Sequence, residues 1–424
     1  MWDTAAFRAG TITAARERSN MSAKAESNPR AASLDQFPRA SDPLVVAMLY
    51  NRNGMAAWCW EAAHALHEQG RSVILIASAD VPLPGIPEVE VVRVDIADKP
   101  AKQRGGIAEA LSTARSHLAA GPDGALKTIH MNLAARGVSP AAYVLNQSTL
   151  VDRSVPCTQI AAAWSYPVSL LGYLRKTPLL VPERSVKAYL RTAMSSLGWW
   201  RKDWRAYRTA DRVLSVTEAL HKSLRRRSAP SDLVYPGTSV SPRADSGDGG
   251  IRLLMAAVEL GEPRKRIVWM LQAMKKMNPP PGTVLQLAGD ADDSVRRAAA
   301  QVRFPVEFLG HLKREKLQQV MRQAHIFCLG SLLDDWGYLL VEAMANGLTP
   351  VAPAVSPFNE ILDGVGLCYS PHSQGDFIRA LRSIDSGSLA DKGRQAWDRA
   401  QNLFSRQAFG RSILASLESA ARLR

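Results

Sequence analysis

The sequence has few of the features that mark several common protein classes. Its four cysteines (Cys59, Cys157, Cys328 and Cys368) lie far apart and form no CxxC pair. This spacing argues against a disulfide framework or a zinc site and favours buried thiols in a reducing compartment. No apolar run reaches the length that spans a bilayer, and no hydrophobic signal-peptide region opens the sequence, so we expect a cytoplasmic protein.

Acidic residues are also fewer than basic ones. The 53 lysines and arginines exceed the 39 aspartates and glutamates, which gives a formal net charge of +14 over 424 residues. Nucleic acid, an anionic membrane or a phosphorylated substrate would each suit that charge. A phosphate site uses only a few of these charges, so the remainder predicts a weak attraction to an anionic surface. The length is sufficient for two domains with sizeable cores.

The first half of the sequence has an order of elements that is typical of an α/β domain. Residues 1–40 are small, polar and arginine-bearing, and we expect a disordered extension there. Beyond them the patterns predict helices at 56–69 and 107–119, and strands at 44–50, 72–78, 89–94 and 127–131. The last of these strands would end at His130. A histidine in that place either lines a ligand site or is only a hydrogen-bonded part of the structure.

Aromatic and basic residues alternate between Ser165 and Tyr207. One interpretation is an amphipathic helix whose tryptophans pack on the core. The other is an interfacial patch, with tryptophans at the level of the lipid headgroups and basic residues on anionic lipid. No OB, RRM or helix-turn-helix pattern supports specific binding of nucleic acid.

The second half is organised around the segment 330–357. An apolar strand at 326–329 precedes an acidic turn, and a helix is expected at 338–346 with Gly347 at its end. Another strand follows at 348–355. This order places a helix amino end beyond the carboxyl end of a strand, where open α/β sheets bind ligands.

The residue types in this segment suit a phosphorylated sugar ligand. The N–H groups at the amino end of the helix favour a phosphate, and Gly337 lets it approach the backbone closely. Asp334 and Glu342 would repel the phosphate, so they suit sugar hydroxyls on either side of it. Alternatively, the aspartates cap the helix and Glu342 is solvated.

Parts of the sequence match a known signature. Asp334-Asp335-Trp336-Gly337 followed by Glu342-Ala343-Met344-Ala345-Asn346-Gly347 resembles the acidic signature of family-4 glycosyltransferases of GT-B fold. The segment 210–220 resembles the run that closes the first domain of that family, and 233–238 resembles its hinge. The resemblance implies an α/β fold with two Rossmann-like domains facing a cleft. It also implies transfer of a hexosyl-type sugar from a nucleotide-diphosphate donor to an acceptor hydroxyl, with retention of anomeric configuration and with no required metal or cofactor.

The resemblance also indicates site residues. In the family the first acid contacts the donor sugar, the second contacts the ribose, and a basic pair neutralises the diphosphate. Lys265 or Arg264 suits the lysine of that pair, whereas Glu259 stands near the place of the arginine. The candidate catalytic residues are Asp334, Lys265 and His130. The candidate donor-binding residues are Glu342, Asp335, Trp336, Gly337, Tyr338, Arg264, Gly289 and His311, and the acceptor-side loop holds Asn53 and Gly54.

Four segments and several partners follow from this interpretation. The expected segments are an extension (1–40), an acceptor-side domain (41–235), a nucleotide-sugar domain (236–406) and a helix that crosses back to the first domain (407–424). The expected partners are a nucleotide sugar, a glycan, lipid-linked or small-molecule acceptor, and an anionic surface on the inner face of the membrane, with no specific nucleic acid. Two other functions stay open: a GT-B nucleotide-sugar epimerase and a non-catalytic sugar-nucleotide binder.

Overall fold

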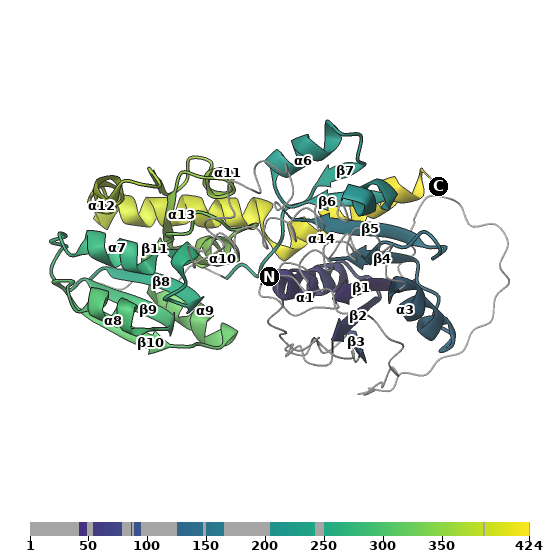
Figure 1. The fold of residues 1–424 in the computed structure, drawn as a ribbon, viewed down its shortest axis with the longest axis horizontal. Coiled ribbons are helices and arrows are strands. Elements are labelled where there is room, and N and C mark those ends of the chain that lie inside the picture. Colours follow the sequence, from purple (N-terminus) through teal and green to yellow (C-terminus); the bar gives the residue numbers. More distant parts are fainter. Residues whose placement is uncertain are drawn as a thin grey trace, which may run out of the picture. The chain divides into compact units, whose positions relative to one another are not determined.

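The computed structural model describes residues 42–48, 54–78, 86, 89–94, 125–146, 150–164, 204–241, 250–384 and 386–423. These residues form two compact units, each with its own parallel sheet (Figure 1). The first unit holds the described residues up to Val234 and those from Phe409 onward, and the second unit is Tyr235–Ala408.

The first unit is built on a seven-stranded sheet with the order β3-β2-β1-β4-β5-β6-β7. Its strands are β1 (Leu44–Met48), β2 (Val73–Ser78), β3 (Glu90–Val94), β4 (Ala142–Leu145), β5 (Thr158–Ala163), β6 (Arg212–Ser215) and β7 (Ser231–Leu233). Its described helices are α1 (Gly54–Glu68), α3 (Ala125–Ala134), α6 (Glu218–Arg225) and α14 (Arg406–Ala421). The apolar strands are covered on both faces, which explains why β4 and β5 are buried at every position.

One predicted strand of this unit is wrong. Residues 127–131 lie in the helix α3, and the strand between β1 and β5 is β4. The buried residues of α3, Leu126, Ile129 and Leu133, are three and four positions apart, which is the spacing of one helix face.

The second unit is built on a six-stranded sheet with the order β10-β9-β8-β11-β12-β13. Its strands are β8 (Arg252–Glu259), β9 (Val284–Asp290), β10 (Val306–Gly310), β11 (Ile326–Cys328), β12 (Thr349–Pro353) and β13 (Leu367–Tyr369). Its helices are the 3-10 turn η3 (Pro263–Lys265), α7 (Ile267–Met274), α8 (Asp293–Ala299), α9 (Arg314–Gln323), α10 (Tyr338–Ala345), α11 (Phe358–Leu362), α12 (Gln374–Arg382) and α13 (Ser386–Leu403). In both sheets the first strand lies between the second and the fourth, which is the strand order of a Rossmann-like domain.

Alternate residues of β8 enter two separate cores. Leu253 and Met255 pack into one core with α7, α8 and α12. Leu254 and Ala256 pack into the other core with α9, α10 and α13. Helices therefore cover both faces of this sheet, and the predicted α/β class is confirmed.

The helix predicted at 338–346 is α10. Leu340, Val341, Ala343 and Met344 are fully buried, so the helix is apolar on most sides because it lies between the sheet and α13. Gly347 follows it with a φ of +80°, the left-handed conformation expected at its end.

Several expectations concern residues that the structure does not describe. These are the extension 1–40, the helix 107–119, Asn53 and most of the aromatic and basic stretch, 165–203. At the described end of that stretch, Trp204 and Tyr207 are buried, whereas Arg205 and Arg208 are exposed. This end is therefore an amphipathic segment whose aromatic residues pack on the core.

Two expectations about composition concern thiols and membrane spans. Cys59, Cys157 and Cys328 are buried free thiols, and Cys368 is exposed. Within the described ranges, no helix combines the length and the apolar character that crossing a membrane requires.

Candidate functional site

The carboxyl ends of β8 and β11 are neighbours at the point where the strand order of the second sheet reverses. Open α/β sheets bind ligands at such a point. β8 leads into η3, and β11 leads into the acidic turn 330–337. A Cβ on Gly330 would lie 2.7 Å from the carbonyl oxygen of Lys265, so glycine is needed where the two loops touch.

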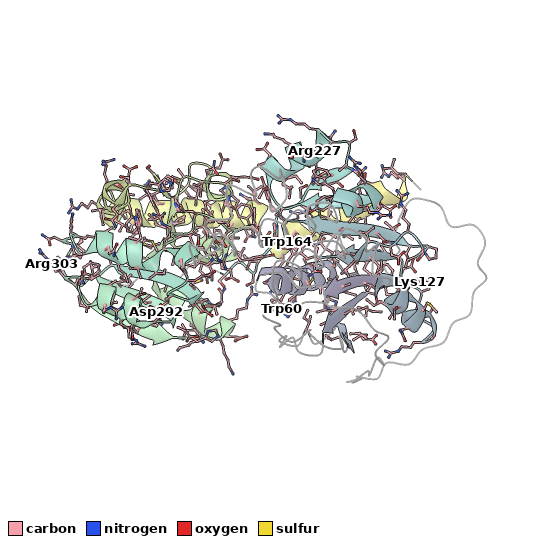
Figure 2. The ribbon with its side chains drawn as sticks, in the orientation of Figure 1. Trp60, Lys127, Trp164, Arg227, Asp292 and Arg303 are labelled. Carbon is pink, nitrogen blue, oxygen red and sulfur yellow. The ribbon has the colours of Figure 1, made fainter. Side chains whose placement is uncertain are left out.

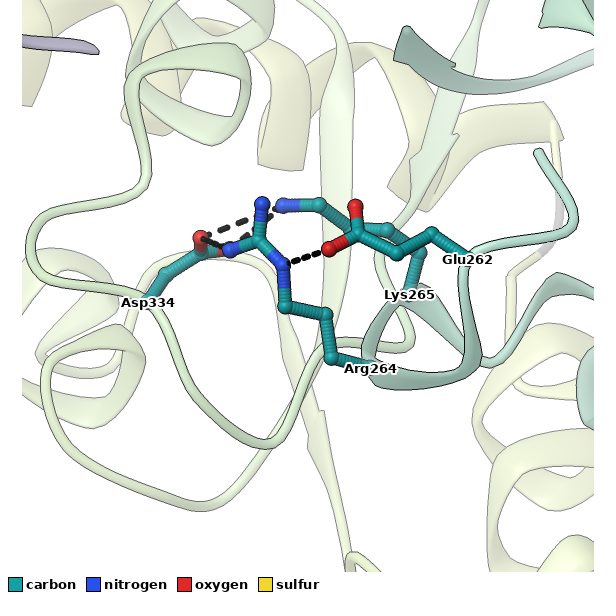
Figure 3. A network of polar contacts seen from close by, with 4 residues as sticks. All are labelled: Glu262, Arg264, Lys265 and Asp334. Atoms are coloured by element: carbon teal, nitrogen blue, oxygen red, sulfur yellow. Dashed lines mark hydrogen bonds and ion pairs between the residues drawn. The ribbon is translucent and has the colours of Figure 1, made fainter. Parts of the chain in front are cut away.

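Charged residues from these two loops form one network (Figure 3). Arg264 Nη1 donates to Asp334 Oδ1 at 3.1 Å, and Lys265 Nζ donates to both carboxylate oxygens of Asp334 at 3.1 Å. Arg264 Nε also donates to Glu262. The side chains of Lys265 and Asp334 are only 15% and 16% exposed, so water screens their attraction weakly.

The network has consequences for the charge of each group. Burial by itself lowers the pKa of Arg264, but the hydrogen bond that it donates to Glu262 and the charge of Asp334 raise it above its usual value. Arg264 therefore keeps its positive charge and lies between two carboxylates, Glu262 and Asp334, whereas Lys265 pairs with Asp334. A diphosphate placed here would compete with Asp334 for both cations. Glu259 is exposed at the end of β8, and Arg264 is, beside Lys265, a second cation in contact with Asp334.

α10 begins directly beyond the acidic turn. Its N-cap residue, Gly337, has a φ of +102° and no side chain to cap the helix. A Cβ on Gly337 would lie 2.9 Å from Cε1 of Phe358, so the backbone angle and the buried ring both require glycine. Asp334 is held by cations and does not cap this helix. The amino end of α10, with its partial positive charge, thus follows three residues after Asp334, the residue that contacts both Arg264 and Lys265.

Glu342, in the second turn of α10, is not solvated, and that alternative is wrong. Its side chain is 8% exposed, and its Oε1 lies 2.9 Å from Nη2 of Arg314, the first residue of α9. Sequence reasoning missed Arg314, because nothing in a single basic residue at a helix start indicates a partner on another helix. The ion pair orients the Glu342 carboxylate in a largely buried place.

The remaining donor-side candidates differ in environment. Trp336 is buried against Tyr235 and Phe404, with ring centroids at 5.4 and 5.5 Å, so its side chain packs the loop. Gly289 has a φ of +136°, and a Cβ there would lie 1.9 Å from the carbonyl oxygen of the facing strand. His311 is exposed just beyond β10, and Asp335 and Tyr338 are half-buried in the loop and at the helix start.

The basis for expecting His130 at the site, a strand end, is wrong. His130 lies in the middle of α3, and its Nδ1 is 2.9 Å from the hydroxyl oxygen of Tyr143 in β4. The residue that follows β4 is Asn146, whose carbonyl oxygen accepts a hydrogen bond from Trp164 Nε1 at 2.8 Å. Asn146 is fully buried, and neither polar atom of its side chain has a hydrogen-bond partner among the described residues. Buried amide groups normally form hydrogen bonds, so Asn146 is a candidate ligand-binding residue that the sequence did not indicate.

Two expectations remain: the acceptor-side loop and the absence of a required metal. Gly54 is the first residue of α1, and Asn53 lies outside the described residues. Across the part of the chain that the structure describes, no group of three or more His, Cys, Asp or Glu side chains is placed to hold a metal ion.

Comparison of sequences gives a match over the second unit. Residues 252–385 match the family described as glycosyl transferases group 1. A phosphatidyl-myo-inositol mannosyltransferase of Mycolicibacterium smegmatis is 31% identical over 104 residues, which is 24% of this chain and 27% of that protein. The chain thus matches about a quarter of the length of the curated relatives.

Comparison of structures covers most of the chain. Sucrose-phosphate synthase from Thermosynechococcus elongatus aligns with a TM-score of 0.66 and 17% identity, over 90% of this chain and 100% of that one. Anabaena Alr3699/HepE in complex with UDP aligns with a TM-score of 0.56 and 16% identity, over 89% of this chain and 100% of that one. The chain therefore has the two-domain GT-B fold of these glycosyltransferases, as predicted, and its residues 252–385 are similar in sequence to the glycosyl transferases group 1 family.

Proposed function

We propose that this protein is a glycosyltransferase that moves a hexosyl-type sugar from a nucleotide-diphosphate donor to an acceptor hydroxyl. The observation that carries the proposal is the network of Arg264, Lys265 and Asp334 beside the amino end of α10. It combines cations for a diphosphate with a carboxylate for sugar hydroxyls, and it lies within the segment that matches the glycosyl transferases group 1 family.

Each residue has a role in this proposal. Arg264 and Lys265 bind the donor diphosphate, and they stabilise the negative charge that collects on it as the bond to the sugar breaks. Asp334 accepts hydrogen bonds from hydroxyls of the donor sugar. Glu342 does the same for the ribose, in the orientation that Arg314 gives it.

The chemical step in the proposal exchanges one bond for another at the anomeric carbon. The bond from that carbon to the diphosphate oxygen breaks, and a bond to the acceptor oxygen forms on the same face, with retention. The departing diphosphate oxygen takes the proton of the acceptor hydroxyl. The step therefore needs no carboxylate base from the protein and no metal.

The similar proteins indicate which donors and which acceptors to test first. HepE is in complex with UDP, so UDP-sugars are the first donors to test. The curated relative is named for transfer to phosphatidyl-myo-inositol, so a lipid-linked acceptor is a natural candidate beside glycans and small molecules. With such an acceptor the protein works in the cytoplasm, attached peripherally to the inner face of the membrane.

The test begins with binding. Nucleoside diphosphates and nucleotide-diphosphate sugars are screened for those that raise the melting temperature of the protein. The nucleotide sugars that do so are then assayed for nucleotide release with and without acceptors. We expect release that depends on an acceptor, whereas an epimerase converts the donor without one and a non-catalytic binder releases nothing. Glu342→Ala should weaken donor binding, with Glu315→Ala, an exposed glutamate on α9, as the control. Unchanged donor turnover in Glu342→Ala would refute the site.

A further inference from the structure

Seven exposed basic residues of the first unit lie on three neighbouring segments: the turn before β5, the helical segment 204–209 and the end of α6. We call this set the basic surface. It consists of Arg153, Arg205, Arg208, Lys222, Arg225, Arg226 and Arg227, all of which are exposed. Figure 2 labels Arg227 beside α6.

Contacts hold the three segments together. Arg153 Nη2 donates to the carbonyl oxygen of Arg208 at 3.5 Å, which links the turn to the helical segment. The guanidinium carbon of Arg227 lies 4.7 Å from the ring centroid of Trp204, which links the end of α6 to the same segment. Arg205 and Arg208 are one helical turn apart and so point to the same side. The basic surface is thus continuous and belongs entirely to the first unit.

Little negative charge offsets these cations. Glu218 pairs with Lys222 at 2.8 Å, and Asp211 accepts a hydrogen bond from a backbone N–H of β5. Among the residues that the structure describes, no carboxylate forms an ion pair with Arg225 or Arg226. Burial lowers the pKa of His221, and the charges of Arg225 and Lys222 lower it further, whereas Asp232 and Glu218 act in the opposite direction.

Among the residues that the structure describes, the basic surface offers no apolar side chain to insert into a membrane. Leu220 and Leu224, the apolar residues of α6, are 1% exposed, and Trp204 and Tyr207 are 8% and 3% exposed. No described aromatic ring of this surface is therefore available to stack on a nucleic-acid base. What remains is a set of cations suited to a broad anionic surface that is held by charge alone.

We propose that the basic surface attaches this protein peripherally to membranes that contain anionic lipid, through electrostatic attraction without insertion. This inference rests on the membrane attachment within the proposed function and is independent of the transfer chemistry. Each basic residue near an anionic membrane strengthens binding about fivefold at low salt. Neutralising three of them should therefore weaken vesicle binding roughly a hundredfold, and added salt should release the wild-type protein.

The experiment compares two triple variants of the full chain by flotation. The test variant is Arg208→Gln/Arg225→Gln/Arg226→Gln, and the control is Lys275→Gln/Lys276→Gln/Arg303→Gln, which removes the same charge from exposed positions of the second unit. The vesicles are phosphatidylcholine alone and phosphatidylcholine with about one-third phosphatidylglycerol. Thermal melting confirms that both variants fold.

We expect the wild-type protein and the control variant to float with the anionic vesicles at low salt, and the test variant to stay in the bottom fraction of the gradient. Equal flotation of the two variants would overturn the proposal, as would flotation that persists in high salt. A gel shift with a single-stranded oligonucleotide forms the other arm. Tighter binding of the oligonucleotide than of the vesicles, lost in the test variant, would assign the surface to nucleic acid and overturn the proposal.

The outcomes separate this inference from the proposed function. Nucleotide binding by the test variant should equal that of the wild type, because none of the three residues belongs to the donor site. If the wild-type protein binds vesicles but no nucleotide, the proposed transferase function is refuted and the proposed membrane attachment stands. If it binds nucleotide but no vesicles, the membrane attachment is refuted and the proposed transferase function stands.

Discussion

Replacing Asp334 with asparagine should change stability and nucleotide affinity in opposite directions. The carboxylate joins Arg264 and Lys265 at 3.1 Å, and both Asp334 and Lys265 are mostly buried. Hydrogen bonds to charged groups contribute about 1.5–3 kcal/mol each, and asparagine keeps an acceptor oxygen in the same place. We therefore expect Asp334→Asn to lower the free energy of unfolding by about 1–2 kcal/mol.

The same change should make the site more attractive to a diphosphate. Once the carboxylate charge is gone, Arg264 and Lys265 no longer have to exchange one anion for another when the nucleotide binds. A gain of about 1.4 kcal/mol corresponds to roughly tenfold tighter binding. Sugar transfer should nevertheless fall, because an amide is a poorer acceptor for the donor sugar's hydroxyls than a carboxylate.

Urea unfolding and calorimetric titration with UDP measure the two quantities. Glu262→Gln is the matched control, because Glu262 contacts Arg264 and should give a smaller effect in the same direction. If Asp334→Asn weakens UDP binding and lowers stability together, the nucleotide does not compete with Asp334 for the two cations. The assignment of the diphosphate to this network would then be abandoned.

Three further predictions concern other parts of the structure. Arg314→Gln should reduce the preference for ribonucleoside over 2′-deoxyribonucleoside diphosphates in titrations, because Glu342 loses the partner that orients it. Arg314→Lys should keep part of that preference, and an unchanged preference in Arg314→Gln would give Arg314 a structural role only. Gly337→Ala should lower the free energy of unfolding by about 1–3 kcal/mol more than Gly364→Ala in urea titrations, since both glycines have positive φ but only the first meets a buried ring. Equal losses would contradict that contact. Phe409→Ala should cost about 3–5 kcal/mol, measured in the same way, because its ring is 1% exposed in the core of the first unit, and a cost below about 1 kcal/mol would show that it is not part of that core.

Local sequence patterns were enough to predict the elements that form the candidate site. The helix α10 and the glycine that ends it, and the strands on either side, follow from apolar periods and turn residues close together in the chain, whereas Arg264 and Lys265 were indicated by the family resemblance. The wrong strand at 127–131 has a physical explanation. Its run of mixed apolar and polar residues alternates over a few positions, whereas the helical spacing of Leu126, Ile129 and Leu133 appears only over a longer window.

The pairing of charges across the site could not be predicted in this way. Arg264 and Asp334 are 70 positions apart, and Arg314 and Glu342 lie on different helices. Their contacts depend on the order of strands in the sheet, which a single sequence does not specify residue by residue. The same holds for the basic surface, because Arg153 and Arg208 are 55 positions apart and meet only after folding.

The position of α14 affects how the protein is made. Phe409 packs on Trp58 of α1 with ring centroids 5.6 Å apart, and Ile413 and Leu417 are fully buried in the first unit. A nascent chain that has just finished Val234 therefore lacks a part of its own first core. Ala421 lies 187 residues after Val234, so at about 5–20 residues per second the ribosome needs roughly 9 to 37 seconds to deliver the missing helix. Throughout that interval Trp58 lacks its contact with Phe409, and we expect the apolar surface that α14 later covers to be prone to aggregation.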